Sequence, residues 1–193
     1  MQLRSMQAGF AMIEVMVTVA IITVGISGMG MLLIRAIQGT QDSAQQSQAM
    51  WIVQDYVGRM RANPEGALAR FYELDPNNLD CSTPPTICAE IFKDGDEVAS
   101  TICDATTMAT FDNWITSCDL NSGIYDSASD FIVNPNLTST CTATSARQSQ
   151  ITFADSCVQY QVTLTWDTKI TTASSVAEER INQNTYNLIV EFN

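Results

Sequence analysis

The feature that most constrains the fold is an uncharged apolar run near the amino terminus, twenty residues from Val15 to Ile34. As an α-helix rising about 1.5 Å per residue, it would span roughly 30 Å, the hydrocarbon thickness of a bilayer. A cleaved secretory signal fits poorly, because only Arg4 supplies positive charge before the run and such signals have an apolar stretch of about 7–15 residues. The best small-residue cleavage candidate, Gly25 to Gly30, lies inside the run. The run therefore predicts a membrane-spanning helix.

Glu14 places a carboxylate inside this apolar block. A charge deep in a membrane helix costs about 2.5–3.5 kcal/mol on insertion scales, which suggests that such a residue has a function. The alternative is that Glu14 reaches interfacial water, or is stabilised by the positive end of the helix. Charge alone leaves both interpretations open.

The residues around Glu14 carry a specific motif, Gly9-Phe10-Ala11-Met12-Ile13-Glu14-Val15. It resembles the processing signal of type IV prepilins and type II secretion pseudopilins, although family members often have Thr-Leu where this chain has Ala11-Met12. The resemblance implies that residues 1–9 are a leader peptide. A prepilin peptidase would cleave between Gly9 and Phe10 and methylate the new amino terminus at Phe10.

The chemistry of this arrangement predicts a role for Glu14 in assembly. The new α-amine of Phe10 would be largely cationic at neutral pH and needs an anionic partner. When subunits stack with a small axial offset, the Glu14 carboxylate of one can meet the Phe10 amine of the next, and an apolar filament core screens that attraction weakly. Such a pair penalises misregistered packing even where desolvation cancels its net stabilisation. We therefore interpret Glu14 as a residue that sets assembly register.

Beyond Arg35 the sequence becomes polar, and then an apolar stripe with helical spacing follows. Its members repeat at i, i+3, i+4, i+7 and i+11 and are Ala49, Ile52, Val53, Tyr56 and Met60. Asn63-Pro64 should end the helix. We expect residues 10–35 to form the transmembrane or filament-core helix and residues 36–63 its amphipathic continuation, a rod of about 78 Å from Phe10 to Arg61 if unbroken.

Three further patches narrow the resemblance. They are Gln48 to Pro64, which ends in Arg59-Met60-Arg61-Ala62-Asn63-Pro64, then Asp112-Asn113-Trp114, and finally Cys157 to Trp166. Together they resemble PilV-type minor pilins, also described as type IV pilus modification proteins. In the second patch one residue fewer separates the Asp and the Trp than in that family.

The remaining segment, 64–193, predicts a periplasmic globular head, which makes the fold class α+β and type IV pilin-like. Alternation of apolar and polar residues predicts strands at Val158–Trp166 and Tyr186–Phe192, with a shorter one at Gln150–Phe153. The residues from Thr171 to Asn184 should form a polar connection. These strands suffice for a small antiparallel sheet whose apolar face packs on the long helix.

All of the cysteines follow the apolar run, and none is in a C-x-x-C pattern: Cys81, Cys88, Cys103, Cys118, Cys141 and Cys157. An even set in an exported domain indicates disulfides, formed in an oxidising periplasm. A helix suggested by Ala105, Met108, Ala109, Asp112 and Ile115 would hold Cys103 and Cys118 about 22 Å apart. Disulfides need Cα atoms within about 7 Å, so these two should not pair with each other. The remaining connectivity stays open.

Composition and motifs argue against several functional classes. The chain has 21 acidic and 9 basic residues, and its net charge of −12 disfavours binding to nucleic acid. It has no His, so it lacks the residue that a catalytic triad or a usual zinc site requires. We therefore expect no enzyme activity, no cofactor and no metal. Asp94-Gly95-Asp96-Glu97 lacks the ligand series of an EF-hand, so a solvated turn is preferred to a calcium site. Trp51 and Trp114 are expected to be core residues rather than ligand platforms.

These observations predict a minor pilin that joins the initiating or tip complex of a type IV pilus and so supports twitching motility and attachment. Its partners would be other minor pilins, the major pilin and the prepilin peptidase. It would start in the inner membrane as a single-pass protein with its head in the periplasm and end in the surface pilus. A type II secretion pseudopilin and a receptor-binding pilus adhesin are the alternatives.

Overall fold

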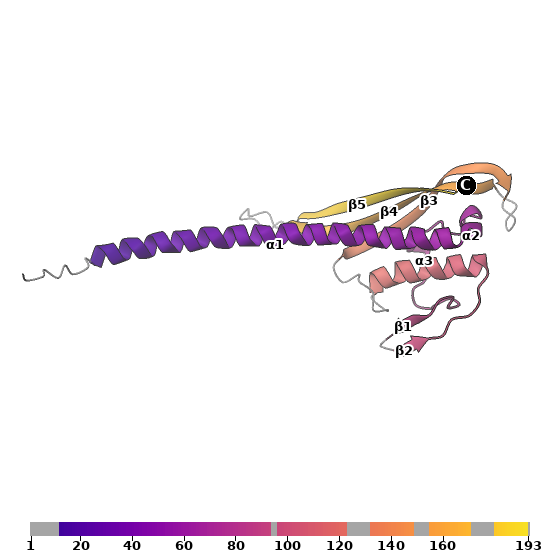
Figure 1. Ribbon diagram of the computed structural model, residues 1–193, viewed down its shortest axis with the longest axis horizontal. Helices are drawn as coiled ribbons and strands as arrows, with labels where there is room; N and C mark the ends of the chain where they lie inside the picture. The colour runs from indigo at the N-terminus through magenta and orange to yellow at the C-terminus, as the bar shows by residue number, and fades with distance from the viewer. Residues whose placement is uncertain (1–11, 94–95, 123–131, 149–154, 171–179, 193) are drawn as a thin grey trace, which may run out of the picture. The chain divides into compact units, whose positions relative to one another are not determined.

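The computed structural model describes residues 12–93, 96–122, 132–148, 155–170 and 180–192. The chain divides into two compact units, Met1–Ser43 and Ala44–Asn193. Helix α1, Met12–Ala62, supplies the described part of the first unit and enters the second. The second unit adds a three-stranded antiparallel sheet, further helices and a short hairpin (Figure 1). The predicted α+β fold, a long apolar helix followed by a small antiparallel sheet, is confirmed.

The amino-terminal part of α1 exposes its apolar side chains. Met12, Ile21 and Val24 are 85%, 67% and 74% exposed, and α1 is long and apolar enough to cross a membrane. Its few hydroxyls are satisfied within the helix, since Thr18 and Thr23 donate to carbonyls three residues back and Ser27 to one four residues back. Such internal bonds leave few polar groups that need water. This segment therefore suits a surrounding of lipid or apolar protein.

The sheet of the second unit has the order β3-β4-β5, with every neighbouring pair antiparallel. Its strands are β3 (Val133–Gln148), β4 (Asp155–Ile170) and β5 (Arg180–Glu191). The other elements are α2 (Pro64–Leu68), the 3-10 helix η1 (Pro76–Asn78), the hairpin strands β1 (Ile91–Lys93) and β2 (Asp96–Val98), and α3 (Ala105–Ser122).

The predicted strands are confirmed in part. Val158–Trp166 lies within β4, and most of Tyr186–Phe192 lies within β5, but both strands run further toward the connection between them. The predicted Thr171–Asn184 connection was therefore too long, because β5 already begins at Arg180. The third strand is β3, which the sequence analysis missed, whereas Gln150–Phe153 falls outside the described residues.

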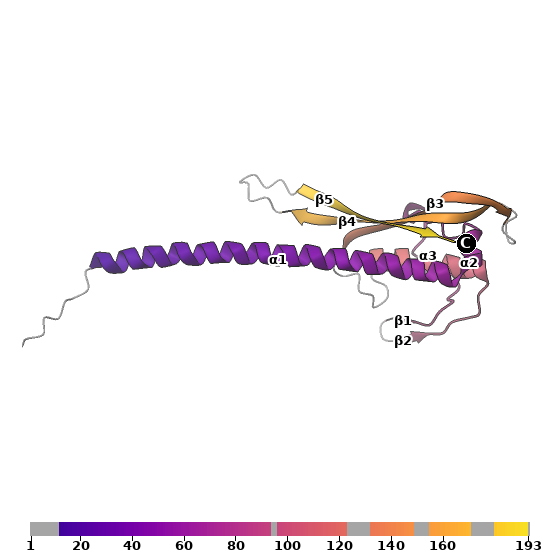
Figure 2. The ribbon, with the colours of Figure 1, turned by 45° about the horizontal axis from the view of Figure 1, so that its top comes forward.

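The core forms where the end of α1 packs on the sheet (Figures 1 and 2). The predicted stripe is confirmed, since Ala49, Val53, Tyr56 and Met60 are all buried and Ile52 is half-buried. Across from them lie the inward-facing side chains of β4 and β5, which are Tyr160, Val162, Leu164, Trp166 and Val190. Helix α1 ends at Ala62, as predicted from Asn63-Pro64. Asn63 does not continue the helix but forms the N-cap of α2.

Candidate functional site

The structure locates one of the three residues predicted for processing and assembly. Gly9 and Phe10 lie outside the described residues, whereas Glu14 lies in the first turn of α1 with an exposed side chain. Within the described part of its own chain, Glu14 forms no ion pair. The structure therefore leaves this carboxylate accessible to a group from another subunit.

A buried polar network joins two of the motif patches that the sequence analysis singled out. At its centre is Asp112 of α3, whose side chain is 5% exposed. One carboxylate oxygen accepts a hydrogen bond from the Arg59 Nη1 of α1 at 3.2 Å, and the other accepts one from the Tyr72 hydroxyl at 2.6 Å. Arg59 also binds Asp55 at the surface, Nε to Oδ2, at 2.8 Å. The network therefore fixes α3 against the end of α1.

Asn113, the neighbour of Asp112, extends the network on the other side. Its side-chain oxygen accepts from the Tyr56 hydroxyl at 2.7 Å, and its Nδ2 donates to the Phe71 carbonyl at 2.9 Å. Tyr56 also donates to the Tyr72 carbonyl at 3.1 Å. Tyr56, which the sequence analysis assigned to the apolar stripe, therefore also makes polar contacts through its hydroxyl.

Burial keeps the phenols of this network protonated. Desolvation raises the pKa of Tyr56 well above its ordinary value. Burial and the hydrogen bond to Asp112 likewise raise the pKa of Tyr72. For Arg59, burial lowers the pKa, but the hydrogen bonds and charges of Asp55 and Asp112 outweigh it and raise the pKa above normal. The donors thus keep their protons throughout the neutral range.

Asn63 closes the network at the junction of α1 and α2. Its Nδ2 donates to the Ala105 carbonyl at 2.7 Å and to the Tyr72 hydroxyl at 3.2 Å, while its Oδ1 caps α2 by accepting from the Gly66 N–H at 3.2 Å. The sequence analysis recognised Asn63-Pro64 only as a helix stop. It missed Tyr72, which lies in an irregular segment where periodicity gives no signal.

Gly66 is a position where this junction tolerates no side chain. A Cβ there would lie 2.6 Å from the Asn63 Nδ2 and 3.0 Å from the Ala105 carbonyl oxygen. We expect Gly66→Ala to displace Asn63 and lower the free energy of unfolding by about 1–3 kcal/mol, measured by chemical denaturation. Gly58→Ala is the control, because a Cβ at Gly58 meets no heavy atom within 4 Å. That variant should be neutral or about 1 kcal/mol more stable, and equal losses in both variants would contradict the prediction.

The cysteines form three disulfides, with no free cysteine, and so agree with the expectation for an exported head. The pairs are Cys81–Cys118, Cys88–Cys103 and Cys141–Cys157, with Cα–Cα distances of 5.3, 5.6 and 5.9 Å. Cys103 and Cys118 do not pair with each other, as the helix between them required. The first bridge ties the segment before β1 to α3, the second closes the base of the β1–β2 segment, and the third ties β3 to β4.

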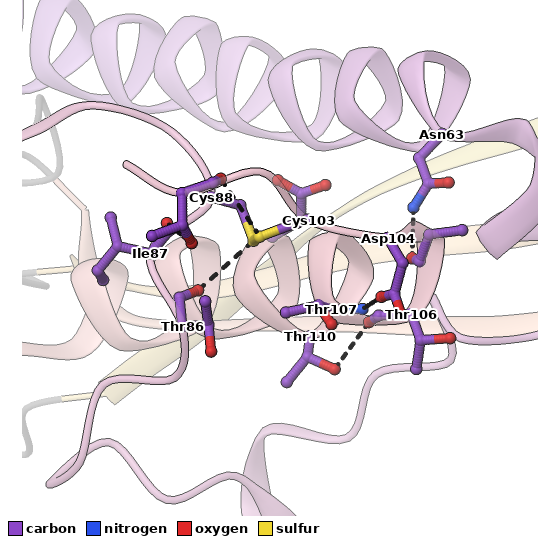
Figure 3. Close-up of a disulfide and its surroundings, with 12 residues drawn as sticks. Asn63, Thr86, Ile87, Cys88, Cys103, Asp104, Thr106, Thr107 and Thr110 are labelled. Carbon is purple, nitrogen blue, oxygen red and sulfur yellow. Dashed lines mark hydrogen bonds between the residues drawn. A yellow bond between two sulfur atoms is a disulfide. The ribbon is translucent and has the colours of Figure 1, made fainter. Parts of the chain in front are cut away.

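Figure 3 shows the Cys88–Cys103 bridge beside the start of α3. Asp104 accepts a hydrogen bond from the Thr107 N–H at 2.8 Å, which stabilises the first turn of that helix. Close by, the Thr101 N–H donates to the Ile87 carbonyl at 2.9 Å and so pairs the two segments that lead into the bridge.

The two tryptophans expected in the core differ. Trp114 is 2% exposed, and its indole N–H donates to the Asp80 carbonyl at 3.2 Å, which confirms the expectation. Trp51 is 73% exposed, so that expectation was wrong. On α1 it lies on the side of the helix away from the stripe that packs on the sheet. Asp94 and Gly95 of the candidate calcium loop lie outside the described residues.

Comparison with known families gave two matches. Residues 31–114 match the family described as type IV pilin Tt1218, and residues 4–30 match the prokaryotic N-terminal methylation motif. No curated protein and no solved structure gave a significant match. The first match includes Arg59, Tyr72 and Asp112, and the second includes Gly9, Phe10 and Glu14. With these matches and this fold, the chain is a type IV pilin that carries a prepilin N-terminal methylation motif.

Proposed function

We propose that this pilin is a minor pilin of the PilV type, a structural subunit that promotes assembly of a type IV pilus at its initiating or tip complex. The observation that carries the proposal is the methylation motif placed directly on an apolar helix whose described side chains are exposed. Such a helix needs lipid before assembly and other subunits after it. The role is structural and not catalytic.

In this mechanism, prepilin peptidase cuts between Gly9 and Phe10 and methylates Phe10 while α1 anchors the chain in the inner membrane. The new amine of one subunit then pairs with the Glu14 carboxylate of a neighbour as the helix leaves the bilayer. The accessible Glu14 side chain supports this step, since its own chain offers no described cation for it. Other minor pilins and the major pilin would supply the neighbouring subunits.

Two of the patches that resemble PilV-type proteins support the narrower assignment, because the fold brings their residues together. Arg59 and Asn63 from the end of α1 contact Asp112 and the Ala105 carbonyl of α3. A network that spans both patches gives a physical reason for them to occur in the same protein. The head that it braces would support twitching motility and attachment through the pilus.

Mass spectrometry of sheared surface pili tests the proposal. We expect a mature chain that starts at methylated Phe10, and Gly9→Leu should retain the leader. An amino terminus near Gly28 or Gly30 would show ordinary signal-peptide cleavage instead.

Deletion of the gene separates the pilus role from its alternatives. Loss of surface pili with intact protein secretion supports a minor pilin. The reverse result would identify a type II secretion pseudopilin. Pili that form normally but no longer attach would indicate an adhesin.

A further inference from the structure

The three-stranded sheet has two outer edges, one formed by β3 and the other by β5. The β3 edge is irregular and partly occupied by the chain itself. Its pairing with β4 shifts register at four places, it contains Pro135, and Leu74 exchanges two backbone hydrogen bonds with Ser139, at 2.8 and 3.0 Å. Bulges, proline and covered backbone are the usual devices that keep an edge strand from pairing with another chain.

The outer edge of β5, which we call the free edge, lacks these devices. Strand β5 pairs with β4 in one unbroken register along its whole length. Between Arg180 and Glu191 its sequence contains no proline, no glycine and no charged residue. Among the described residues, no strand pairs with β5 on the side away from β4. One edge of the sheet is therefore protected, and the other is a regular template for a further strand.

A single hydrogen bond shows which backbone groups face the free edge. The Phe192 N–H donates to the Val158 carbonyl at 2.8 Å, directly across the register that β4 and β5 share. In an antiparallel pair, hydrogen-bonded and non-hydrogen-bonded residue pairs alternate. The even-numbered residues of β5 therefore bond to β4. The N–H and C=O groups of the odd-numbered residues, which include Thr185, Asn187 and Ile189, point toward the free edge.

The core-facing side chains of β5 remain partly exposed beside this edge. Tyr186 and Leu188 pack against the core but are only half-buried, whereas the residues opposite them in β4, Leu164 and Val162, are 0% exposed. A strand added beside β5 would cover these two side chains as β5 itself covers β4. On that face, the added strand needs apolar residues.

Charge and the outer face of β5 narrow the chemistry of the partner further. The chain has a net charge of −12, and the last residue of β5 is the exposed Glu191. Like charges on neighbouring strands repel, so an acidic segment is disfavoured. Thr185 and Asn187 are exposed on the outer face, which favours polar residues opposite them.

We propose that the free edge of β5 binds an extended segment of another polypeptide as a fourth, antiparallel strand. The segment is neutral or basic and alternates apolar with polar residues. Its polar residues exchange backbone hydrogen bonds with the odd-numbered residues of β5, and its apolar residues pack beside Tyr186 and Leu188. Backbone pairing supplies the attachment and the alternate side chains supply the specificity. This inference goes beyond the proposed function and does not rest on it.

Amide hydrogen exchange of the full chain in detergent micelles, followed residue by residue, tests the proposal. The probe is a short synthetic peptide of alternating valine and threonine with a lysine at each end. In the free chain the amides of Thr185, Asn187 and Ile189 should exchange fast, and saturating peptide should slow them by at least about tenfold. Amides that are already slow in the free chain, or that stay fast with the peptide, would overturn the proposal.

Two N-methylated peptides of equal composition separate strand addition from adsorption to the surface or the micelle. Methylation of every valine amide leaves the threonine amides free to pair with β5, so this peptide should bind like the parent. Methylation of every threonine amide blocks the pairing edge and should weaken binding about tenfold or more. Fluorescence anisotropy of labelled peptides measures both affinities, and equal affinities would contradict strand addition in the proposed register.

A matched pair of substitutions tests the same register from the protein side. Asn187→Pro removes an N–H that points to the free edge and leaves the bonds to β4 in place, since proline is tolerated where the N–H of an edge strand faces outward. It should weaken binding of the parent peptide about tenfold, whereas Asn187→Ser, which keeps the N–H, should not. Circular dichroism checks that both variants fold. Equal binding by the two folded variants would overturn the proposal, and if Asn187→Pro fails to fold, the N-methylated peptides decide the question on the wild-type chain.

Discussion

Replacing Asp112 by alanine should lower the free energy of unfolding of the head by about 3 kcal/mol. The substitution leaves the Arg59 guanidinium and the Tyr72 hydroxyl without their shared buried acceptor. Breaking a buried ion pair from one side costs about 3–5 kcal/mol. The loss in the free energy of unfolding should lie at the lower end of this range, because the Arg59 side chain is 33% exposed and keeps its ion pair with Asp55. Denaturant unfolding of the oxidised full chain, followed by tryptophan fluorescence, measures the loss.

Asp55→Ala is the matched control, since it removes the other carboxylate from the same guanidinium. The Asp55 side chain is 62% exposed, against 5% for Asp112. Surface pairs contribute only about 0.2–1 kcal/mol, so this variant should lose less than about 1 kcal/mol. Similar losses in the two variants would mean that burial does not decide the value of the contact.

Tyr72→Phe gives an intermediate test. It removes only the hydroxyl that donates to Asp112 and accepts from Asn63, and leaves the Arg59–Asp112 pair in place. A buried hydrogen bond to a charged group contributes about 1.5–3 kcal/mol. The loss should therefore lie between those of the two aspartate variants, and a loss as small as that of Asp55→Ala would show that the hydroxyl is dispensable.

The sequence predicted those elements whose burial follows one regular period. The stripe on α1 repeats at helical spacing because one side of the helix packs on the sheet, and β4 alternates strictly because only one of its faces is buried. Strand β3 has no such signal. Its inward positions include Ser139, and its outward ones are mostly threonine, so apolar residues do not alternate with polar ones there.

The polar network could be predicted only in pieces. Asp112, Asn113 and Asn63 belong to recognisable motifs, but nothing in the spacing of the sequence says that they meet. Their contact depends on how α3 docks beside the end of α1, which long-range packing and the disulfide Cys81–Cys118 help to fix. Trp51 shows the converse, since its aromatic side chain suggested burial, but its position on α1 is away from the stripe and leaves it exposed.

Replacing Glu14 by valine should leave leader cleavage and membrane insertion intact but reduce incorporation into pili to a small fraction of the wild-type level. Insertion should be unchanged or improved, because a carboxylate in an apolar helix costs about 2.5–3.5 kcal/mol. Assembly should fail, because the amine of a neighbouring Phe10 would enter the filament core unpaired. Breaking such a buried pair costs about 3–5 kcal/mol, enough to lower incorporation more than a hundredfold if assembly is at equilibrium.

Glu14→Gln is the finer variant, because it keeps the size and an acceptor oxygen but loses the charge. We expect it to be cleaved and to remain in the membrane, with incorporation reduced as in Glu14→Val, if charge sets the register. Immunoblots of the membrane and sheared-pilus fractions measure residence and incorporation, and mass spectrometry measures cleavage. Wild-type incorporation of Glu14→Val would refute the charge-register mechanism. Glu14 would then be a carboxylate that merely reaches interfacial water near the start of an exposed helix.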